Sequence, residues 1–139
     1  MTSIDTNVII RYLVGDDATQ AEAARALLDG LTPEDPGFIC REVAMEIAWV
    51  LERSYGFVRA QVAKALMDMT SSDSLLVENP DDVVASAHRY RQGGVGFSDL
   101  MILSAAKRVG ATPLYTFDRR LARMEGAALA GDKTGGASS

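Results

Sequence analysis

Near its start the chain contains Thr2-Ser3-Ile4-Asp5-Thr6-Asn7-Val8-Ile9-Ile10, and the fold follows from how this stretch is interpreted. A short strand is predicted to run into Ile4, and an apolar helix is predicted to start after Asp5 and to end at Val14. A carboxylate, a hydroxyl and an amide side chain then lie at the carboxyl end of a strand. In open α/β sheets ligands bind at that end, because strand ends and helix N-termini converge there. Asp5 is therefore the first candidate for a metal-binding acid.

The composition limits the class of protein. With 139 residues, of which 47% are hydrophobic and 24% charged, the chain suits one globular domain. Its net charge of −5 argues against binding nucleic acid through bulk positive charge, unless a metal neutralises a cluster of acids. The single cysteine, Cys40, cannot form an internal disulfide and is expected to be a small core residue beside a strand. No signal peptide is expected and no apolar run reaches the ~18 residues of a membrane span, so we expect a cytoplasmic protein.

Apolar periodicity predicts strands that alternate with helices. After the first strand, strands are predicted at 37–40, 74–78 and 113–116, and a weak candidate for a final strand lies at 125–129. Helices are predicted at 7–14, 18–31, 41–55, 57–69, 79–91, 97–109 and 119–124. This order predicts a single α/β domain over residues 1–126, with a short parallel sheet of four or five strands flanked by helices. Residues 127–139 are expected to form a largely disordered C-terminal tail.

Acidic residues recur at positions that could meet at one edge of this sheet. Asp99 lies in the first turn of a predicted helix, and Asp118 follows a predicted strand with a hydroxyl residue nearby, as Asp5 does. Glu42 and Glu46 share one side of the helix at 41–55, and periodicity alone leaves the choice between them open. Clustered carboxylates repel one another unless a cation is bound, and oxygen ligands suit Mg²⁺ or Mn²⁺. A metal that activates water and polarises a phosphate is typical of a phosphodiesterase or nuclease.

Other polar residues have simpler structural interpretations. Asp16 and Asp17 precede the helix at 18–31, where we expect them to act as caps rather than as metal ligands. Asn79 is expected to be the N-cap of the next helix, and Asp81 and Asp82 lie in the first turn of that helix, where acids complement the helix dipole. His88 is the only histidine and is expected to be an ordinary helix residue, because no second histidine offers a metal partner.

Four segments, taken in order, resemble the PIN-domain ribonucleases, especially the VapC-type toxins of bacterial type II toxin–antitoxin pairs. They are Ile4–Val14, Glu46–Leu51, Phe97–Ile102 and Thr116–Ala122, and they span nearly the whole chain up to about residue 126. The resemblance selects Glu46 over Glu42 through the Ile-Ala-Trp-Val-Leu that follows it. It implies that the catalytic acids are Asp5, Glu46, Asp99 and Asp118, that Asp5, Asp99 and Asp118 bind the metal, and that Thr6, Asn7 and Thr116 support them.

The same resemblance implies a magnesium-dependent endoribonuclease, with Mn²⁺ as a substitute metal. Such proteins are commonly homodimers inhibited by a cognate antitoxin whose peptide covers the active site. Two features depart from the family pattern: Gly96 stands where an additional acid often precedes the phenylalanine, and the final strand is weak. RNA would require cations near the acids. The candidates for binding RNA are Arg11, Arg119 and Arg120, with Arg41, Arg89, Arg91 and Arg123 as further arginines whose alternative role is surface pairing.

Rival functions make different demands on the same positions. A haloacid-dehalogenase-type phosphotransferase needs a second aspartate where Asn7 stands, and a response-regulator receiver needs a lysine near Thr116–Asp118. The more serious alternative is a catalytically inactive PIN-like module that binds RNA or protein. Such a module typically loses one or more of the core acids, and all four are present here. The sequence therefore favours the nuclease.

Overall fold

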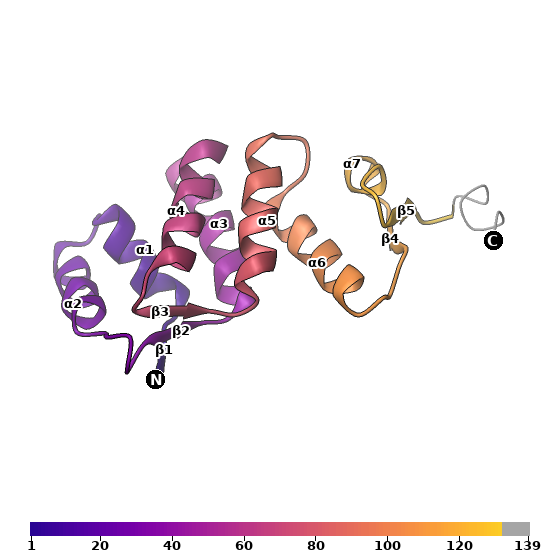
Figure 1. The fold of residues 1–139 in the computed structure, drawn as a ribbon. Coiled ribbons are helices and arrows are strands. Elements are labelled where there is room, and N and C mark those ends of the chain that lie inside the picture. The colour runs from indigo at the N-terminus through magenta and orange to yellow at the C-terminus, as the bar shows by residue number, and fades with distance from the viewer. Residues whose placement is uncertain (132–139) are drawn as a thin grey trace.

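The computed structural model describes residues 1–131, in which helices and parallel strands alternate along an elongated molecule (Figure 1). The strands and helices are, in order, β1 (Thr2–Ser3), α1 (Thr6–Val14), α2 (Ala18–Asp29), β2 (Gly37–Ile39), α3 (Arg41–Tyr55), α4 (Arg59–Ser71), β3 (Leu75–Val77), α5 (Pro80–Arg91), α6 (Phe97–Arg108), β4 (Leu114–Thr116), α7 (Arg119–Ala122) and β5 (Ala127–Leu129). No helix in this part of the chain has the length and apolar character that a membrane crossing requires.

The first three strands form a parallel sheet in the order β1-β2-β3. Thr2 pairs with Gly37, and Gly37 pairs in turn with Leu75. The backbones approach closely there: a Cβ added to Gly37 would lie 2.9 Å from side-chain carbons of both Ile4 and Leu31, so no larger residue fits without movement. Ile4 and Ile39 are buried beneath the flanking helices, which fixes the end of β1 against the core.

The last two strands form a separate parallel pair, β4-β5, with Leu114 opposite Ala127 and Thr116 opposite Leu129. Together with α7 they make up a unit over Leu114–Leu129, which we call the arm. Figure 1 shows the arm at the opposite end of the molecule from β1–β3, beyond α6. It packs on α6 through Leu121, which is buried, and through Gly126, where an added Cβ would lie 2.8 Å from Lys107 Cε. The arm is therefore attached to α6, and β4 has no bond to β1.

Tyr90 fixes the loop from which α6 starts. Its ring is buried, meets Phe97 edge-to-face with centroids 6.2 Å apart, and lies 4.5 Å below the guanidinium carbon of Arg59. Its hydroxyl donates to Glu52 Oε2 at 2.5 Å, and the pKa of Tyr90 is raised, first by burial and then by this bond. Arg59 Nη1 also donates to the carbonyls of Tyr90 and Val95, at 2.7 and 2.8 Å. These contacts hold the first turn of α6, which carries Asp99.

The structure confirms the predicted α/β class and parallel strands. Helix α3 has the predicted bounds, and most other predicted elements differ by one or two residues. Two findings differ from the expected single sheet and tail. The five strands fall into two sheets, because β4 pairs with β5 and not with β1. Ala127–Leu129 is a strand, formed by pairing with β4 after the turn at Gly126, and the rest of the predicted tail, 132–139, lies outside the described residues.

The helix starts confirm one predicted cap and correct another. Asp17 Oδ1 accepts from Gln20 N at 3.0 Å and so caps α2 as expected. Asn79 precedes α5, but its side chain makes no capping bond, and the predicted cap is wrong in that respect. The amide oxygen of Asn79 instead accepts from Arg41 Nη1 at 3.1 Å, which ties the start of α5 to the start of α3.

Candidate acidic site

Asp5 and Glu46 are brought together by Thr6. Asp5 is the N-cap of α1, and its Oδ1 accepts from Thr6 N at 2.8 Å. Thr6 is only 6% exposed, and its Oγ1 donates to Glu46 Oε1 at 2.6 Å. The bond joins α1 to α3 and directs the Glu46 carboxylate toward the end of β1. Glu42 lies one turn earlier, in the first turn of α3, so the contact with Thr6 favours Glu46 as the working acid.

Asp99 and Asp118 form a second pair. Asp99 lies in the first turn of α6 and is half-buried, while Asp118 is the N-cap of α7. Asp118 Oδ1 accepts from Arg120 N at 2.8 Å and from Leu121 N at 3.0 Å, and its own N–H donates to Thr116 Oγ1 at 3.0 Å. Partial burial raises the pKa of Asp99, and the negative charge of Asp118 raises it further. The two carboxylates are thus close enough to repel each other.

The structure does not bring the two pairs into one cluster. Within residues 1–131, no three Asp, Glu, His or Cys side chains are placed so that they could bind one metal ion. The physical reason is the division of the sheet: β1 and β4 are not neighbours, so the strand ends that carry Asp5 and Asp118 do not share an edge. Carboxylate and hydroxyl oxygens suit Mg²⁺ or Mn²⁺, so the donor chemistry fits such an ion. The arrangement within one chain does not, because the two pairs of acids lie apart.

The remaining predicted residues divide between structural and accessible positions. Asn7 is exposed and lines a shallow cavity of about 350 Å³ between α1 and α2. Arg11 lines the same cavity but is held in place: its Nε donates to Gln20 at 2.6 Å, and its Nη1 donates to Tyr55 Oη at 3.3 Å and lies 3.6 Å from Asp16. Arg11 therefore joins α1, α2 and α3, and these contacts would compete with its predicted contact with RNA.

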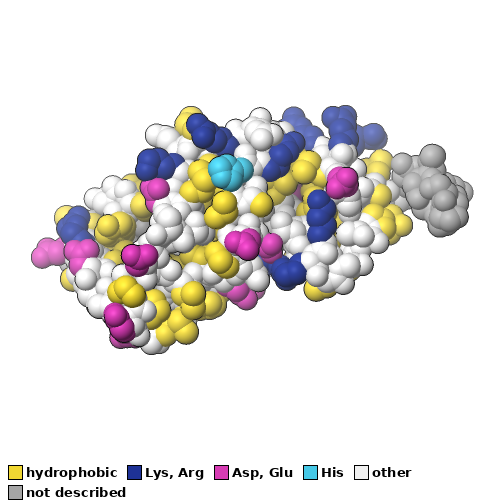
Figure 2. All heavy atoms as spheres, in the orientation of Figure 1, with side chains coloured by type: hydrophobic (Ala, Val, Ile, Leu, Met, Phe, Trp, Pro, Cys, Tyr) yellow, Lys and Arg dark blue, Asp and Glu magenta, His cyan; other side chains and the backbone are white. Residues whose placement is uncertain are grey.

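Three arginines in and directly after α7 are accessible cations. Arg119 and Arg120 are exposed, as is Arg123, and none of the three takes part in an ion pair within residues 1–131. Figure 2 shows basic side chains gathered over the end of the molecule where α7 lies. Arg41, by contrast, is engaged by Asn79, Asp82 and the carbonyl of Met101, so its role is structural.

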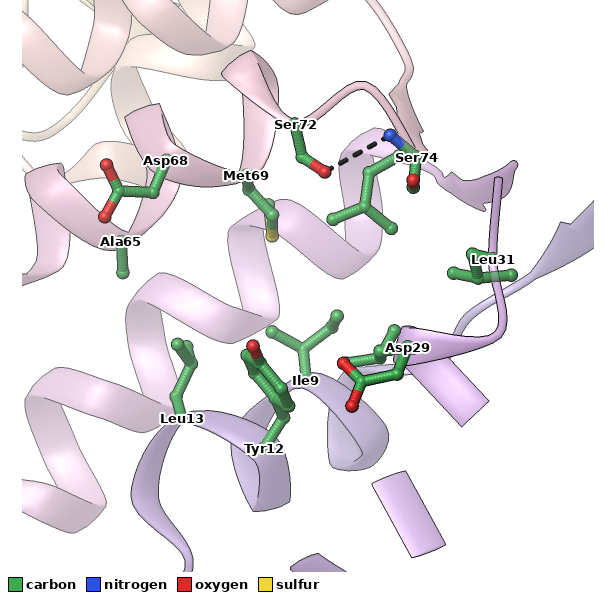
Figure 3. Close-up of a pocket in the computed structure, with 12 residues that line it drawn as sticks. Ile9, Tyr12, Leu13, Asp29, Leu31, Ala65, Asp68, Met69, Ser72 and Ser74 are labelled. Atoms are coloured by element: carbon green, nitrogen blue, oxygen red, sulfur yellow. Dashed lines mark hydrogen bonds between the residues drawn. The ribbon is translucent and has the colours of Figure 1, made fainter. Parts of the chain in front are cut away.

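A larger cavity lies elsewhere. It has a volume of about 540 Å³ and lies between α1, α2 and α4, where apolar side chains such as Ile9, Leu13 and Met69 line it (Figure 3). Its acids are Asp29 and Asp68, and none of the four predicted catalytic acids reaches it. Because it offers no convergent carboxylates or cations, size alone does not make it the reaction site.

A smaller cavity beside Asp99 contains residues that the sequence interpretation missed. It has a volume of about 230 Å³, and its lining includes Trp49, Arg53, Ser98 and Asp99. Trp49 is 58% exposed, and the guanidinium carbon of Arg53 lies 5.6 Å from the centre of its ring. Exposed aromatic rings and arginines are the groups on which nucleobases stack. The sequence feature that could have pointed to this cavity is Trp49, which lies one turn beyond Glu46 and away from the apolar face of α3.

A family model described as the PIN domain matches residues 3–127, a range that contains all four acids. No curated protein matches the chain.

Proposed function

This chain belongs to the PIN-domain family, and we propose that it is a magnesium-dependent endoribonuclease, the toxin of a toxin–antitoxin pair. The PIN domain is a nuclease-type fold, which supports a hydrolase that acts on nucleic acid. The choice of RNA, the metal and the toxin role are our proposal. They are supported by acids at all four positions of the family resemblance and by exposed arginines beside one of them.

One observation carries the proposal: Asp99 is held half-buried and within electrostatic reach of Asp118, so its pKa is raised. Keeping two carboxylates together costs stability, because burial and mutual repulsion both penalise their charged forms. An arrangement that is costly for the fold is typical of a functional site. A divalent cation between the two acids would offset that cost.

The four acids would have different roles. Asp5, Asp99 and Asp118 would supply oxygen ligands for Mg²⁺, or for Mn²⁺ in its place, once the two pairs are brought together. An ion held by these acids would activate a water and neutralise charge on a phosphate. Glu46, which is held by Thr6, would orient the attacking water or accept its proton.

The surface supports RNA as the proposed substrate. RNA would contact Arg119 and Arg120 on α7 and would stack on Trp49 beside Asp99. A cognate antitoxin would inhibit the enzyme by covering the acids. The alternative function, an inactive module that binds RNA or protein, uses the same surface but predicts no dependence of RNA integrity on Asp99.

The test is cleavage of total cellular RNA by the purified protein, freed of any partner, with Mg²⁺ and with EDTA. Discrete fragments that disappear with EDTA and with Asp99→Asn are expected. Asp73→Asn is the matched control, because Asp73 is exposed in the turn between α4 and β3. Intact RNA from folded protein at every Mg²⁺ and Mn²⁺ concentration would instead support the binding module.

A further inference from the structure

Strands β1 and β4 each have one paired and one unpaired edge within residues 1–131. The backbone bonds of β1 go to β2, for example from Ile4 N to Phe38 O at 2.9 Å. Those of β4 go to β5, for example from Ala130 N to Thr116 O at 2.8 Å. An unpaired strand edge carries free N–H and C=O groups and readily adds another strand. The molecule therefore presents two complementary edges that do not meet.

The packing of the arm keeps β4 away from the β1 of its own chain. Leu121 is only 4% exposed and belongs to the hydrophobic core, and Gly126 lies against Leu103 and Lys107 of α6, so the arm is held against α6. Figure 1 shows the arm beyond α6, on the side away from β1. To reach its own β1, the arm would have to leave the face of α6 and expose Leu121.

The arm also exposes apolar side chains that its own chain does not cover. Tyr115, in β4, is 56% exposed, and Phe117, directly after β4, is 84% exposed. Val109, in the segment that connects α6 to the arm, is 73% exposed. Large apolar side chains gathered in one segment at the end of a molecule are typical of an interface.

Charge identifies the kind of surface that the arm fits. The arm carries three arginines against Asp118 and Glu125, whereas residues 1–113 carry ten Lys and Arg against sixteen Asp and Glu. The arm is thus weakly basic and the rest of the chain strongly acidic. Such opposite charges favour contact between the arm of one copy and the acidic part of another.

We propose that the partner of the arm is a second copy of this chain, and that two copies exchange arms so that β4 of each adds to β1 of the other. The exchange is reciprocal, as a two-fold dimer requires. Asp5 and Asp118 each lie two residues beyond the end of their strand, and each caps the next helix. If the strand ends align in a parallel pair, these two acids become neighbours on strands about 4.8 Å apart.

Each acidic site would then combine Asp5 and Glu46 of one copy with Asp99 and Asp118 of the other. This completion of the site rests on the proposed function, whereas the exchange of the arm does not. The alignment also sets a register in which Ser3 of one copy lies opposite Thr116 of the other. That pair provides a direct test of the exchange.

The first experiment is disulfide cross-linking of a chain that carries Ser3→Cys and Thr116→Cys, with Cys40→Ser to remove the native thiol. After oxidation, we expect a covalent dimer on a non-reducing gel and a dimer mass by light scattering. Ser54→Cys with Thr116→Cys is the control, because Ser54 is exposed near the end of α3, and it should not cross-link. A monomer with an internal disulfide would show that the arm closes on its own chain. A monomer without a disulfide, or a dimer that does not cross-link, would also overturn the proposal.

The second experiment is complementation between Asp5→Asn and Asp118→Asn. Chains of each variant alone should be inactive, because every site lacks one acid. Refolded together in equal amounts, half of the dimers contain both variants, and one of the two sites in each is intact. We therefore expect about a quarter of wild-type cleavage from the mixture. Active wild type with an inactive mixture would overturn the shared site, whereas inactive wild type with a positive cross-link would reject the nuclease and retain the exchange.

Discussion

Thr6→Val tests whether Thr6 holds Glu46 in place. The substitution keeps the branched shape of the side chain and removes the hydroxyl that donates to Glu46 Oε1 at 2.6 Å. Because Thr6 is only 6% exposed, bulk water cannot take the place of its hydroxyl in the variant. We expect a loss of both stability and RNA cleavage.

The expected loss of stability is modest. A hydrogen bond to a charged group contributes about 1.5–3 kcal/mol, and the low end applies because Glu46 is exposed and water can solvate it again. The methyl group that replaces the hydroxyl is buried and offsets about 0.5–1 kcal/mol. The net loss is therefore about 1 kcal/mol, which for a chain of this size lowers Tm by roughly 3 °C.

The assay is urea unfolding followed by circular dichroism, on wild type, Thr6→Val, Glu46→Met (which removes the acceptor oxygens) and the double variant. A coupling free energy of about 1 kcal/mol between the two positions is expected from this cycle. Thr6→Ser is the control, because it keeps the hydroxyl and should keep the coupling. Equal destabilisation by Thr6→Val in the presence and absence of the Glu46 carboxylate would refute the reasoning, and Glu42 would become the candidate acid.

Three further predictions concern the neighbouring residues. Asp99→Asn should abolish cleavage and raise stability at pH 7. The pKa of Asp99 is raised in the folded state, so the folded chain binds this proton more tightly than the unfolded chain does. The ionised carboxylate therefore lowers stability as the pH rises above the unfolded pKa of 3.8. Urea midpoints of wild type and variant should therefore differ more at pH 7 than at pH 3. Arg41→Met should lower the free energy of unfolding, measured in urea, by about 3 kcal/mol. The substitution removes the hydrogen-bond donors to Asn79 Oδ1, Asp82 Oδ2 and Met101 O, the last at 2.7 Å. A change below about 0.5 kcal/mol would contradict this prediction. Trp49→Ala should weaken RNA binding in EDTA about tenfold by fluorescence anisotropy, whereas Trp49→Phe should retain most of it, and equal affinity for both variants would exclude stacking.

Local sequence signals were sufficient for the elements and for the position of each acid along the chain. Asp5 and Asp118 were predicted after strands because capping residues and apolar runs are short-range features, and the structure places both at helix N-caps. The choice of Glu46 over Glu42 needed more than helical periodicity. The contact that favours it comes from Thr6, which is 40 positions away in the sequence.

The division of the sheet could not be predicted from the sequence. Strand β4 is a run of three residues, and its apolar character is the same whether a neighbour lies on one edge or on both. Which edges pair is decided by long-range packing, here by Leu121 and Gly126 against α6. The expectation of one central sheet assumed that all parallel strands of a small domain become neighbours.

The acids themselves are positioned independently of that pairing. Asp5 is oriented by the N–H of Thr6, and Asp118 by the N–H groups of Arg120 and Leu121, so each carboxylate is fixed by the first turn of the helix that follows it. Joining β1 to β4 would change the distance between these acids without changing how either is held. Substitutions at the caps should therefore alter the site within one copy, whereas substitutions at Tyr115 or Phe117 should alter only whether two copies complete it.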